Sequence, residues 1–566
     1  MFVILYFFAV LSSAGLLALA IPNEFLLSGS SILGIVSLIP LYTAFIAGKS
    51  KKAIMLMYGF FVPLLHLLSS FWLAYFGDFA IFTLGASTLA YFFLALPFGI
   101  AFYYFSRLKI PYRIFGFALT WSLWEYFKST GFLGYPWGTV AMSATKLTRF
   151  IQIVDITGVW GISFLIPLIS ACLAETILAA VKLSNGFAKE SRRPLVRTLI
   201  FVAFLVLSSI CYGQYKLTHT QEPEKKLNIA VIQQNADPWD MSNFEQILLS
   251  SELLSKRIIS EASEPTDLII WSESSLSYPY QENKYYYEIA PAELPVTDFL
   301  KEVDTPLFSG SPLLTDPEND GYSNAVSLIL PDASVAESYA KMQMVPFAEY
   351  IPGINNPLVK KLFSAIVGFS SGWVPGTECK LFSLQTKNGE SVRFATPICY
   401  EDAFPSVCAH LHQQGSELLI NLTNDSWSKT ASAEYQHYAV AMYRTIELRT
   451  SMIRSTNSGY TVAINPYGKT ITSLPLFVQD GFFLSTPVYP HTMTFYARYK
   501  DWLPLLLFCT FLVCMLSLKK EKHKNLLLKS AEKNIAEMKY KSVFIKKELD
   551  TTVWFCRPCQ NLTCEF

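Results

Sequence analysis

Long runs of apolar residues fill most of the first 215 positions, and one further run lies near the C-terminus. A membrane-spanning helix needs about 20 mostly apolar residues. The runs that satisfy this requirement lie at about 2–21, 26–47, 54–76, 80–105, 112–130, 160–181, 196–214 and 500–518. The first run is also compatible with a signal peptide, but it has no positively charged start and further spans follow at once. We therefore expect about eight helices that cross a membrane.

Basic residues follow every second expected span. Lysines and arginines cluster after the second, fourth, sixth and eighth spans, whereas the short segments 22–25 and 77–79 have none. Because loops rich in Lys and Arg stay in the cytoplasm, both termini are expected there. The large segment after the seventh span is then periplasmic, and segment 131–159 should lie under it. This pattern predicts a multi-pass protein of the bacterial inner (cytoplasmic) membrane.

The stretch between the last two spans has a different pattern, in which short runs rich in β-branched residues alternate with amphipathic stretches. Strands are expected at 227–233, 267–271, 325–330, 335–341, 392–398, 417–422, 460–465 and 481–485, and helices at 242–263 and 433–450. The alternation predicts a mixed α/β domain with one central sheet system. The chain then divides into a seven-span membrane domain at 1–215, a water-facing domain at 220–495, a transmembrane helix at 500–518 and a cytoplasmic tail at 519–566.

Composition narrows the possible functions. The chain is 52% hydrophobic and only 16% charged, with a formal net charge of +1. There is no bulk electrostatic basis for binding nucleic acid, and no basic stripe or finger motif. The ten cysteines are irregularly spaced and do not form a disulfide framework. Cys556, Cys559 and Cys564 lack a clear fourth ligand, so we expect no metal and no cofactor.

Reactive side chains in the water-facing domain fall where strands are expected to end. Glu273 follows the run at 267–271, Cys399 ends the run at 392–398, and Asn424 and Asp425 follow the run at 417–422. In open α/β sheets, sites gather where strands end. These three ends are therefore expected to meet.

The chemistry of these residues fits acyl transfer only when they act together. Cys399 is a possible nucleophile, although a lone cysteine is more often a buried structural thiol. Its acidic neighbours Glu401 and Asp402 would raise its pKa, so a cationic group must compensate. Lys341 is the candidate, because an ammonium lowers the pKa of a thiol and stabilises an oxyanion. Glu273 is then the expected general base.

The order Glu273, Lys341, Cys399 at strand ends resembles the nitrilase, or carbon–nitrogen hydrolase, superfamily. Seven spans before such a domain and one after it are similar to the apolipoprotein N-acyltransferase family. The local motifs that agree are WSE at 271–273, YAKMQMVPFAEYIP at 339–352, CYE at 399–401, NDSW at 424–427, RxxE at 444–447, RSTNxG at 454–459 and GYPW at 134–137. The resemblance ends at about residue 520. Ser272 and Ala348 stand where the family often has proline and glycine, but no departure removes a catalytic residue.

The resemblance implies a polytopic α-helical membrane domain plus an α/β nitrilase-like αββα sandwich domain. It also implies a ping-pong reaction in a membrane-embedded enzyme without a cofactor. The donor would be a phospholipid, whose acyl chain passes to a thioester on Cys399. The acceptor would be the α-amine of the diacylglyceryl-cysteine at the N-terminus of an apolipoprotein. Lipoprotein maturation is the process that this reaction serves.

Other residues receive their expected roles from the same resemblance. Glu349 would orient Lys341 or the nucleophile, and Tyr400 and Glu401 would support it. Trp239 resembles a family tryptophan near the substrate, although an ordinary surface aromatic is equally compatible. The unusually apolar stretch 358–373 is expected to line a lipid access path, with Phe363 and Trp373 in contact with substrate. The alternative for this stretch is a buried helix.

Three other readings of the sequence remain open. A membrane-anchored nitrilase-type amidase would use the same three residues and release its acyl group to water. A transporter or receptor would usually carry several charges inside its spans, and Glu125 and Glu175 are the main ones here. A scaffold with a dead hydrolase domain does not fit the intact glutamate, lysine and cysteine.

Overall fold

The computed structural model describes residues 2–76, 80–183, 192–237, 241–351, 353–354, 356–367 and 372–553. The chain forms two compact units, Met1–Leu507 and Phe508–Phe566. Trp239 and the three C-terminal cysteines lie outside the described residues. The helix α17 (Trp502–Val553) continues through the boundary expected between a last span and a tail at 518/519.

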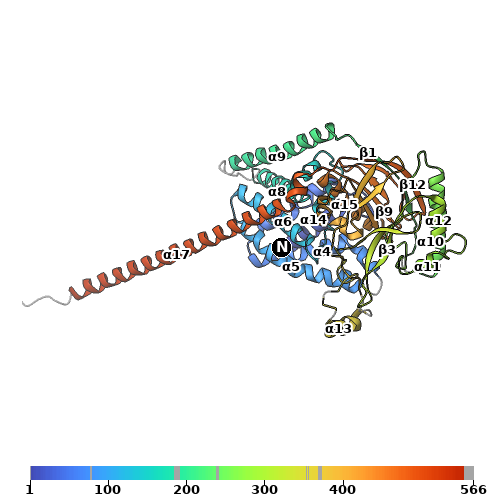
Figure 1. The fold of residues 1–566 in the computed structure, drawn as a ribbon. Helices are drawn as coiled ribbons and strands as arrows, with labels where there is room; N and C mark the ends of the chain where they lie inside the picture. Colours follow the sequence, from blue (N-terminus) through green and yellow to red (C-terminus); the bar gives the residue numbers. More distant parts are fainter. Residues whose placement is uncertain are drawn as a thin grey trace, which may run out of the picture. The chain divides into compact units, whose positions relative to one another are not determined.

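Apolar helices make up the first part of the chain (Figure 1). They are α1 (Phe2–Ala20), α2 (Ser31–Val36), α3 (Ile39–Ala47), α4 (Lys51–Ser69), η1 (Phe71–Tyr75), η3 (Ile81–Ala86), α5 (Ser87–Ser106), α6 (Ile110–Ser129), α8 (Trp160–Leu183) and α9 (Arg192–Thr218). Five segments of the described chain are long and apolar enough to cross a membrane: Lys51–Ser69, Thr83–Ser106, Trp160–Val181, Arg192–Thr218 and Trp502–Lys520. Shorter apolar helices occur at Ile4–Ala20 and Ser31–Ala47. The chain is a membrane protein, and the full count of eight spans stays a prediction.

Helix α6 occupies the fifth expected span but is not among these five segments. It carries three charged side chains, and the described contacts give each a partner inside the protein. Arg113 pairs with Glu175 of α8 at 2.5 Å. Glu125 accepts hydrogen bonds from the Trp121 indole and from the backbone of the next segment. Arg113 is therefore paired with another helix, and Glu125 is bonded within α6 and to segment 131–159.

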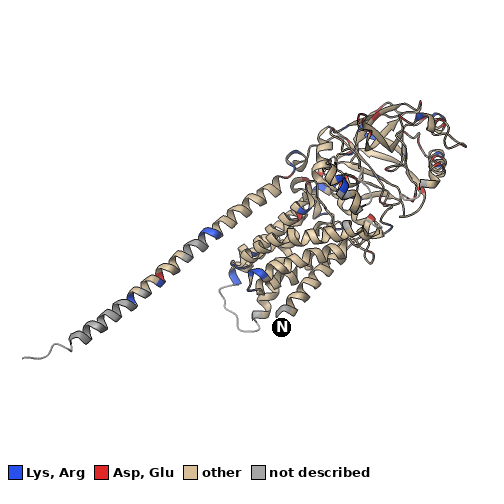
Figure 2. Ribbon diagram, turned by 90° about the horizontal axis from the view of Figure 1, so that it is seen from below, with Lys and Arg blue, Asp and Glu red and all other residues tan. Residues whose placement is uncertain are grey.

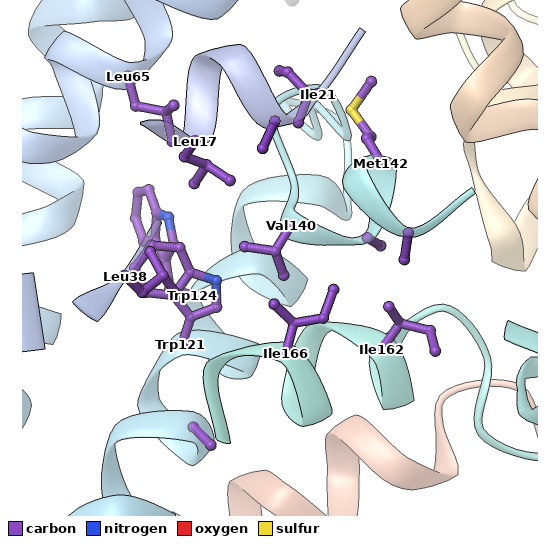
Figure 3. Close-up of a cluster of buried hydrophobic side chains, with 14 of the residues drawn as sticks. Leu17, Ile21, Leu38, Leu65, Trp121, Trp124, Val140, Met142, Ile162 and Ile166 are labelled. Atoms are coloured by element: carbon purple, nitrogen blue, oxygen red, sulfur yellow. The ribbon is translucent and has the colours of Figure 1, made fainter. Parts of the chain in front are cut away.

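Segment 131–159 inserts into the helix bundle and contains η4 (Val140–Ala144), η5 (Ile151–Ile153) and α7 (Val154–Thr157). Figure 3 shows Val140 and Met142 among the buried side chains of Leu17, Trp124 and Ile166. All five are at most 5% exposed. Burial of such large apolar groups fixes the segment against the helices.

The other side of segment 131–159 contacts the sheet domain, as expected from the sequence. The Tyr443 hydroxyl donates to the Ala141 carbonyl at 2.6 Å, and the backbone N–H of Val159 donates to Glu447 at 2.7 Å. The segment therefore joins the helix bundle to the sheet domain.

Figure 2 shows lysine and arginine at helix ends near the N-terminus, on the far side of the bundle from the sheets.

Two six-stranded sheets form the domain after α9. The first has the order β12-β1-β2-β3-β4-β5, and the second has the order β11-β10-β9-β8-β7-β6. The strands are β1 (Lys225–Gln233), β2 (Leu268–Ile270), β3 (Leu307–Asp316), β4 (Gly321–Ile329), β5 (Val335–Ala340), β6 (Phe382–Gln385), β7 (Ser391–Ala395), β8 (Leu418–Thr423), β9 (Ser451–Thr456), β10 (Val462–Ile464), β11 (Thr470–Ser473) and β12 (Asp480–Val488). The single sheet system expected from the strand pattern is wrong, because periodicity does not say which strands pair.

The two sheets pack face to face. Phe308 of the first sheet contacts Phe382 and Phe394 of the second, with ring centroids 5.0 and 5.2 Å apart. Strand β1 is buried on both faces: Ile229 and Val231 point into the layer between the sheets, whereas Ala230 and Ile232 point to the helices outside. This alternation explains why β1 reads as a continuous apolar run.

Helices cover the outer faces of both sheets, which completes the αββα sandwich that the resemblance implied. The outer helices are α10 (Phe244–Ser260) and α12 (Val296–Val303) over the first sheet, and α14 (Pro405–Gln413) and α15 (Ala431–Leu448) over the second. Short helices α11 (Lys284–Tyr287) and α16 (Phe495–Tyr499) and the projecting α13 (Pro357–Val367) lie in connections (Figure 1).

Candidate active site

Glu273, Lys341 and Cys399 meet at one end of the sandwich. Glu273 follows β2, Lys341 follows β5, and Cys399 begins η8 (Cys399–Ala403) after β7. The Lys341 ammonium lies 3.5 Å from Glu273 Oε1, and the Cys399 thiol is close enough to the Glu273 carboxylate for that charge to raise the thiol pKa. Lys341 is fully buried, Glu273 is 5% exposed, and Cys399 is partly exposed. The three residues therefore form one group, of which Cys399 is the most exposed residue.

Glu349 is the fourth member of this group. Its Oε1 accepts from the Lys341 ammonium at 2.7 Å, and its Oε2 accepts from the backbone N–H of Val345 at 2.8 Å. The Asn324 amide donates to Glu273 Oε1 at 2.7 Å and to Glu349 Oε1 at 3.2 Å. Lys341 and Asn324 thus bridge the two carboxylates and fix their orientation.

The charges in the group are arranged for proton transfer. Burial raises the pKa of Glu273, with Lys341 opposing the rise and Glu349 adding to it. Burial alone would lower the pKa of Lys341, but Glu349 and Glu273 hold it well above its ordinary value. Burial has the largest effect on the Cys399 thiol and raises its pKa, and the Glu273 carboxylate raises this pKa further. A permanently charged lysine therefore stands beside a carboxylate with raised proton affinity and an un-ionised thiol.

A backbone amide completes the surroundings of Glu273. The N–H of Asn424, directly after β8, donates to Glu273 Oε2 at 2.8 Å. The two oxygens of Glu273 consequently have separate partners, Oε1 on the lysine side and Oε2 on the β8 side. The expected meeting of the strand ends at 273, 399 and 424 is confirmed by these contacts.

Cys399 has an unusual backbone conformation. Its φ is +48°, in the left-handed region that costs a non-glycine residue about 1–3 kcal/mol. The Asn421 amide supports the turn by donating to the Pro397 carbonyl at 2.8 Å and to the Cys399 carbonyl at 3.3 Å. The backbone thus turns sharply at Cys399, and the following residues form the rest of η8.

Glu401 ties the cysteine turn to the lysine strand. Its Oε2 accepts from the backbone N–H of Ile398 at 2.8 Å. Its Oε1 accepts from the backbone N–H groups of Met342 and Gln343 at 2.7 and 2.9 Å. The Tyr339 hydroxyl donates to the same carboxylate at 3.0 Å. Burial raises the pKa of Glu401 to about 7. Through these bonds, Glu401 fixes the backbone at Ile398 relative to the backbone at 342–343.

Tyr400 connects the cysteine turn to segment 131–159. Its hydroxyl donates to the Gly134 carbonyl at 2.5 Å. Its ring stacks on Trp137 with centroids 5.5 Å apart and an interplanar angle of 11°. The GYPW motif at 134–137 therefore contacts the residue next to the thiol.

A buried group of charges lies behind the cysteine turn. His437 of α15 bridges Asp402 at 2.8 Å and Asp425 at 2.9 Å, and Arg454 of β9 lies 3.4 Å from Asp402. Although burial would lower the pKa of His437, the two carboxylates raise it to about 9. Burial opposes ionisation of Asp425, but His437 and Arg454 lower its pKa. Two cations and two anions therefore balance beside Cys399.

A cavity of about 180 Å³ opens beside Glu273 and includes Trp373, Asn424 and Asn457 in its lining. Of the three residues expected to contact substrate, Trp373 lies in this lining. Trp239 lies outside the described residues, as does the Phe363 side chain, although the backbone of α13 is described.

The apolar stretch at 358–373 is not a buried helix in its described part. Leu358 of α13 is 77% exposed, and the side chains of Lys360 and Lys361 are exposed as well. The buried-helix alternative is therefore wrong for these side chains. Residues 368–371 lie outside the described chain.

Gly310 of β3 lies directly against the backbone of Glu273 and Ser274. A Cβ at this glycine would stand 2.3 Å from the backbone nitrogen of Ser274 and 2.7 Å from Glu273 Cα. Such contacts force the backbone to move. The absence of a side chain at 310 thus lets the chain carrying Glu273 approach β3.

Asn324, Asn421 and His437 were not singled out by the sequence analysis. Asn324 is a polar residue at the edge of an expected buried strand, and Asn421 interrupts an apolar run. His437 is buried in the middle of an expected helix. A polar side chain at a position that should be apolar is the only signal that marks them.

Two families match different parts of the chain. The apolipoprotein N-acyltransferase N-terminal domain matches residues 13–172, and the carbon–nitrogen hydrolase family matches residues 228–480. The first match covers the chain from within α1 to within α8, including all of segment 131–159, and the second covers both sheets except the start of β1 and nearly all of β12.

Similar curated proteins extend over most of the chain. The apolipoprotein N-acyltransferase 2 of Treponema denticola is 51% identical over 505 residues, which cover 89% of this chain and 96% of that protein. The protein of the same name from Treponema pallidum is 50% identical and covers 88% and 92% of the two chains. The apolipoprotein N-acyltransferase of Borreliella burgdorferi is 32% identical and covers 93% and 98%.

Proposed function

The chain belongs to the apolipoprotein N-acyltransferase family, and on that premise we propose how its residues carry out N-acylation of lipoproteins. The donor is a phospholipid, the intermediate is a thioester on Cys399, and the acceptor is the α-amine of an N-terminal diacylglyceryl-cysteine. The observation that carries this proposal is the convergence of three strand ends, which places Lys341 3.5 Å from Glu273 and the backbone of Asn424 2.8 Å from Glu273, with the Cys399 turn held by Asn421 of the same strand, β8.

In the first half of the reaction, Glu273 accepts the thiol proton as the sulfur attacks an ester carbonyl of the phospholipid. Its raised pKa suits it to this step, because a general base works best with a pKa near the working pH. Collapse of the tetrahedral intermediate breaks the ester C–O bond. The proton held by Glu273 passes to the leaving alkoxide, so lysophospholipid departs and the acyl thioester remains.

Lys341 stabilises the oxyanion of each tetrahedral intermediate, together with a backbone N–H near Tyr400. An ammonium in a water-poor site stabilises developing negative charge without reorganisation. Lys341 stays charged throughout, since Glu349 and Glu273 hold its pKa well above the ordinary value. Glu349 orients the ammonium through the 2.7 Å contact.

In the second half, the acceptor amine attacks the thioester carbonyl. Glu273 takes the proton that the amine loses, and the thiolate leaves and recovers a proton from Glu273. The products are an amide on the lipoprotein and a free Cys399 thiol. A membrane-anchored amidase would direct water to the same thioester and release a fatty acid.

The substrates explain why the site adjoins a helix bundle. Both are lipids, so the nucleophile must work near a membrane surface. We propose that the domain at 220–495 is periplasmic, on a bacterial inner membrane, with α13 and Trp373 along the path of the acyl chain. The parts at 1–215, 500–518 and 519–566 then serve as membrane domain, last span and cytoplasmic tail.

Mass spectrometry of Cys399 after incubation with phospholipid, without acceptor, tests the proposal. A mass increase equal to one acyl chain on the peptide containing Cys399 is expected, together with lysophospholipid. Cys399→Ala should remove the adduct. Cys379→Ser is the matched control, because Cys379 is a partly exposed thiol of the same domain and should be dispensable. Absence of an adduct, with free fatty acid released instead, would favour the amidase.

A further inference from the structure

A second cavity, of about 340 Å³, lies where the end of α9 meets α7 and the connection between β12 and α16. Its lining includes Asp155, Lys216, Gln221 and Arg449. None of its lining residues belongs to the catalytic group or to the cavity beside Glu273.

The charged groups in the lining do not balance. The Asp155 carboxylate accepts from the Arg449 guanidinium at 2.8 Å and from the Tyr212 hydroxyl at 2.9 Å, and the Lys216 ammonium lies 3.4 Å away. Asp155 is the one acidic side chain among the described residues that line the cavity, against two permanent cations. The cavity therefore has an excess of one positive charge.

Lys216 is the cation available to a ligand. Arg449 is 5% exposed, and its guanidinium also donates to the side chain and backbone of Gln152. The Lys216 side chain is 33% exposed and has one carboxylate, at a longer distance. An anion that enters the cavity would thus complete the surroundings of Lys216.

Gln221 also lines the cavity and adds a polar wall beside Lys216. Its amide donates to the Thr492 hydroxyl at 2.8 Å, and its Oε1 is buried without a partner in the described chain. The cavity therefore offers a cation to a ligand, with polar groups beside it.

The position of the cavity indicates a lipid. Helix α9 has 27 residues and is about 40 Å long, more than the roughly 30 Å hydrocarbon layer that it would cross. Lys216 lies near its C-terminal end, where head groups would surround it. Further along α9, Phe204 and Leu207 are 62% and 59% exposed, which suits contact with acyl chains. Phe495 at the rim is 47% exposed.

We propose that this cavity binds the phosphate of a membrane phospholipid, with Lys216 facing the phosphate and Gln221 lining the wall beside the head group. The bound lipid is not the acyl donor, because the cavity shares no residue with the catalytic group. It instead occupies the junction of α9 with the sheet domain.

Native mass spectrometry of the full-length protein in detergent tests this proposal, with phosphatidylglycerol as the probe. Wild type should retain one phosphatidylglycerol at collision energies that strip the others. Lys216→Gln should reduce the retained fraction at least fivefold, whereas Lys216→Arg should keep it. Lys256→Gln is the matched control, since Lys256 is 35% exposed and pairs with Glu302 elsewhere on the surface. Equal retention in wild type and Lys216→Gln would overturn the proposal.

Two further measurements separate the alternatives. Melting temperature and thioester formation should be unchanged in Lys216→Gln, which distinguishes a lost lipid site from a lost fold or a failed catalytic proposal. On wild type, millimolar inorganic phosphate should not displace the retained lipid. Displacement by inorganic phosphate would identify a site for the free anion and would overturn the assignment to a lipid.

Discussion

Trp137 of the segment between α6 and α8 stacks on Tyr400, the residue directly after Cys399, with ring centroids 5.5 Å apart. The Trp137 ring also lies 5.4 Å from the His437 ring. A residue of the helix bundle thus contacts both the cysteine turn and the charged group behind it. We therefore expect the position of the thiol to depend on a residue that precedes the sheet domain by more than 80 positions.

Replacing Trp137 tests that dependence. Trp137→Ala removes the stacking partner of Tyr400, and an aromatic pair contributes about 1 kcal/mol beyond its buried area. We expect slower thioester formation on Cys399 with phospholipid, together with a lower melting temperature. Trp137→Phe keeps an aromatic face and should recover most of the rate. If Trp137→Ala forms the thioester at the wild-type rate, the contact does not position the thiol.

On the proposed mechanism, the raised pKa of Glu273 should set the pH dependence of thioester formation. Burial raises this pKa above the ordinary carboxyl value, and Glu273 must be ionised to accept the thiol proton. Single-turnover thioester formation should therefore increase with pH through the pKa of Glu273. No decrease from Lys341 is expected below its ordinary pKa, since its carboxylate neighbours raise it further.

Glu349→Gln provides the informative variant for this profile. Removing the Glu349 charge removes one cause of the rise in the Glu273 pKa, so the rate should begin to increase at lower pH. The maximal rate should fall, because Lys341 loses its 2.7 Å partner. If the pH dependence of the rate is the same in Glu349→Gln as in wild type, a group other than Glu273 causes the loss of rate at low pH.

The ion pairs of His437 predict a pH-dependent stability. Its folded pKa of about 9 lies above the ordinary value of 6.5 because of Asp402 and Asp425, although burial opposes the rise. The resulting stabilisation is fully present below pH 6.5 and is lost as the pH rises through about 9. The melting temperature of wild type should fall across this window.

His437→Asn should destabilise the protein by about 3–5 kcal/mol near neutral pH, because it leaves two buried carboxylates with one cation fewer. Its melting temperature should vary less than that of wild type between pH 6.5 and 9. His410→Asn changes an exposed histidine of the neighbouring α14 and should behave as wild type. Parallel pH profiles for wild type and His437→Asn would contradict the assignment.

Exposed Leu358 gives a test of the lipid path. If α13 contacts the donor, Leu358→Ser should slow thioester formation from phospholipid vesicles several-fold but not from a short-chain, water-soluble ester. Leu253→Ser is the matched control, since Leu253 is 53% exposed on α10 of the same domain. If Leu358→Ser and Leu253→Ser change the rate of thioester formation equally with the phospholipid and with the soluble ester, α13 does not contact the donor.

The positions of the reactive residues followed from the sequence because each lies at the end of a strand. The run at 267–271 is apolar and then gives way to Glu273, and β2 does end there. Runs at 392–398 and 417–422 likewise end near Cys399 and Asn424. Local patterns are sufficient when a strand is buried on both faces and its end is polar.

Other features depend on contacts between distant parts of the chain, which local patterns do not encode. Asn324 joins Glu273 to Glu349 only because β4 pairs with β3 and places its side chain there. The expected span at 26–47 is interrupted between α2 and α3. His437 resembles any polar residue of a helix until Asp402 and Asp425 are seen on both sides of it.

Gly310 has a consequence for the variation that this chain can accept. Any side chain at 310 would displace the backbone of Glu273 and Ser274. Glycine supplies no acid, base or hydrogen-bonding side chain, so a search for catalytic chemistry passes over it. A library of single substitutions selected for activity would nevertheless reject changes at 310 as strictly as changes at 273, and the reason would be space.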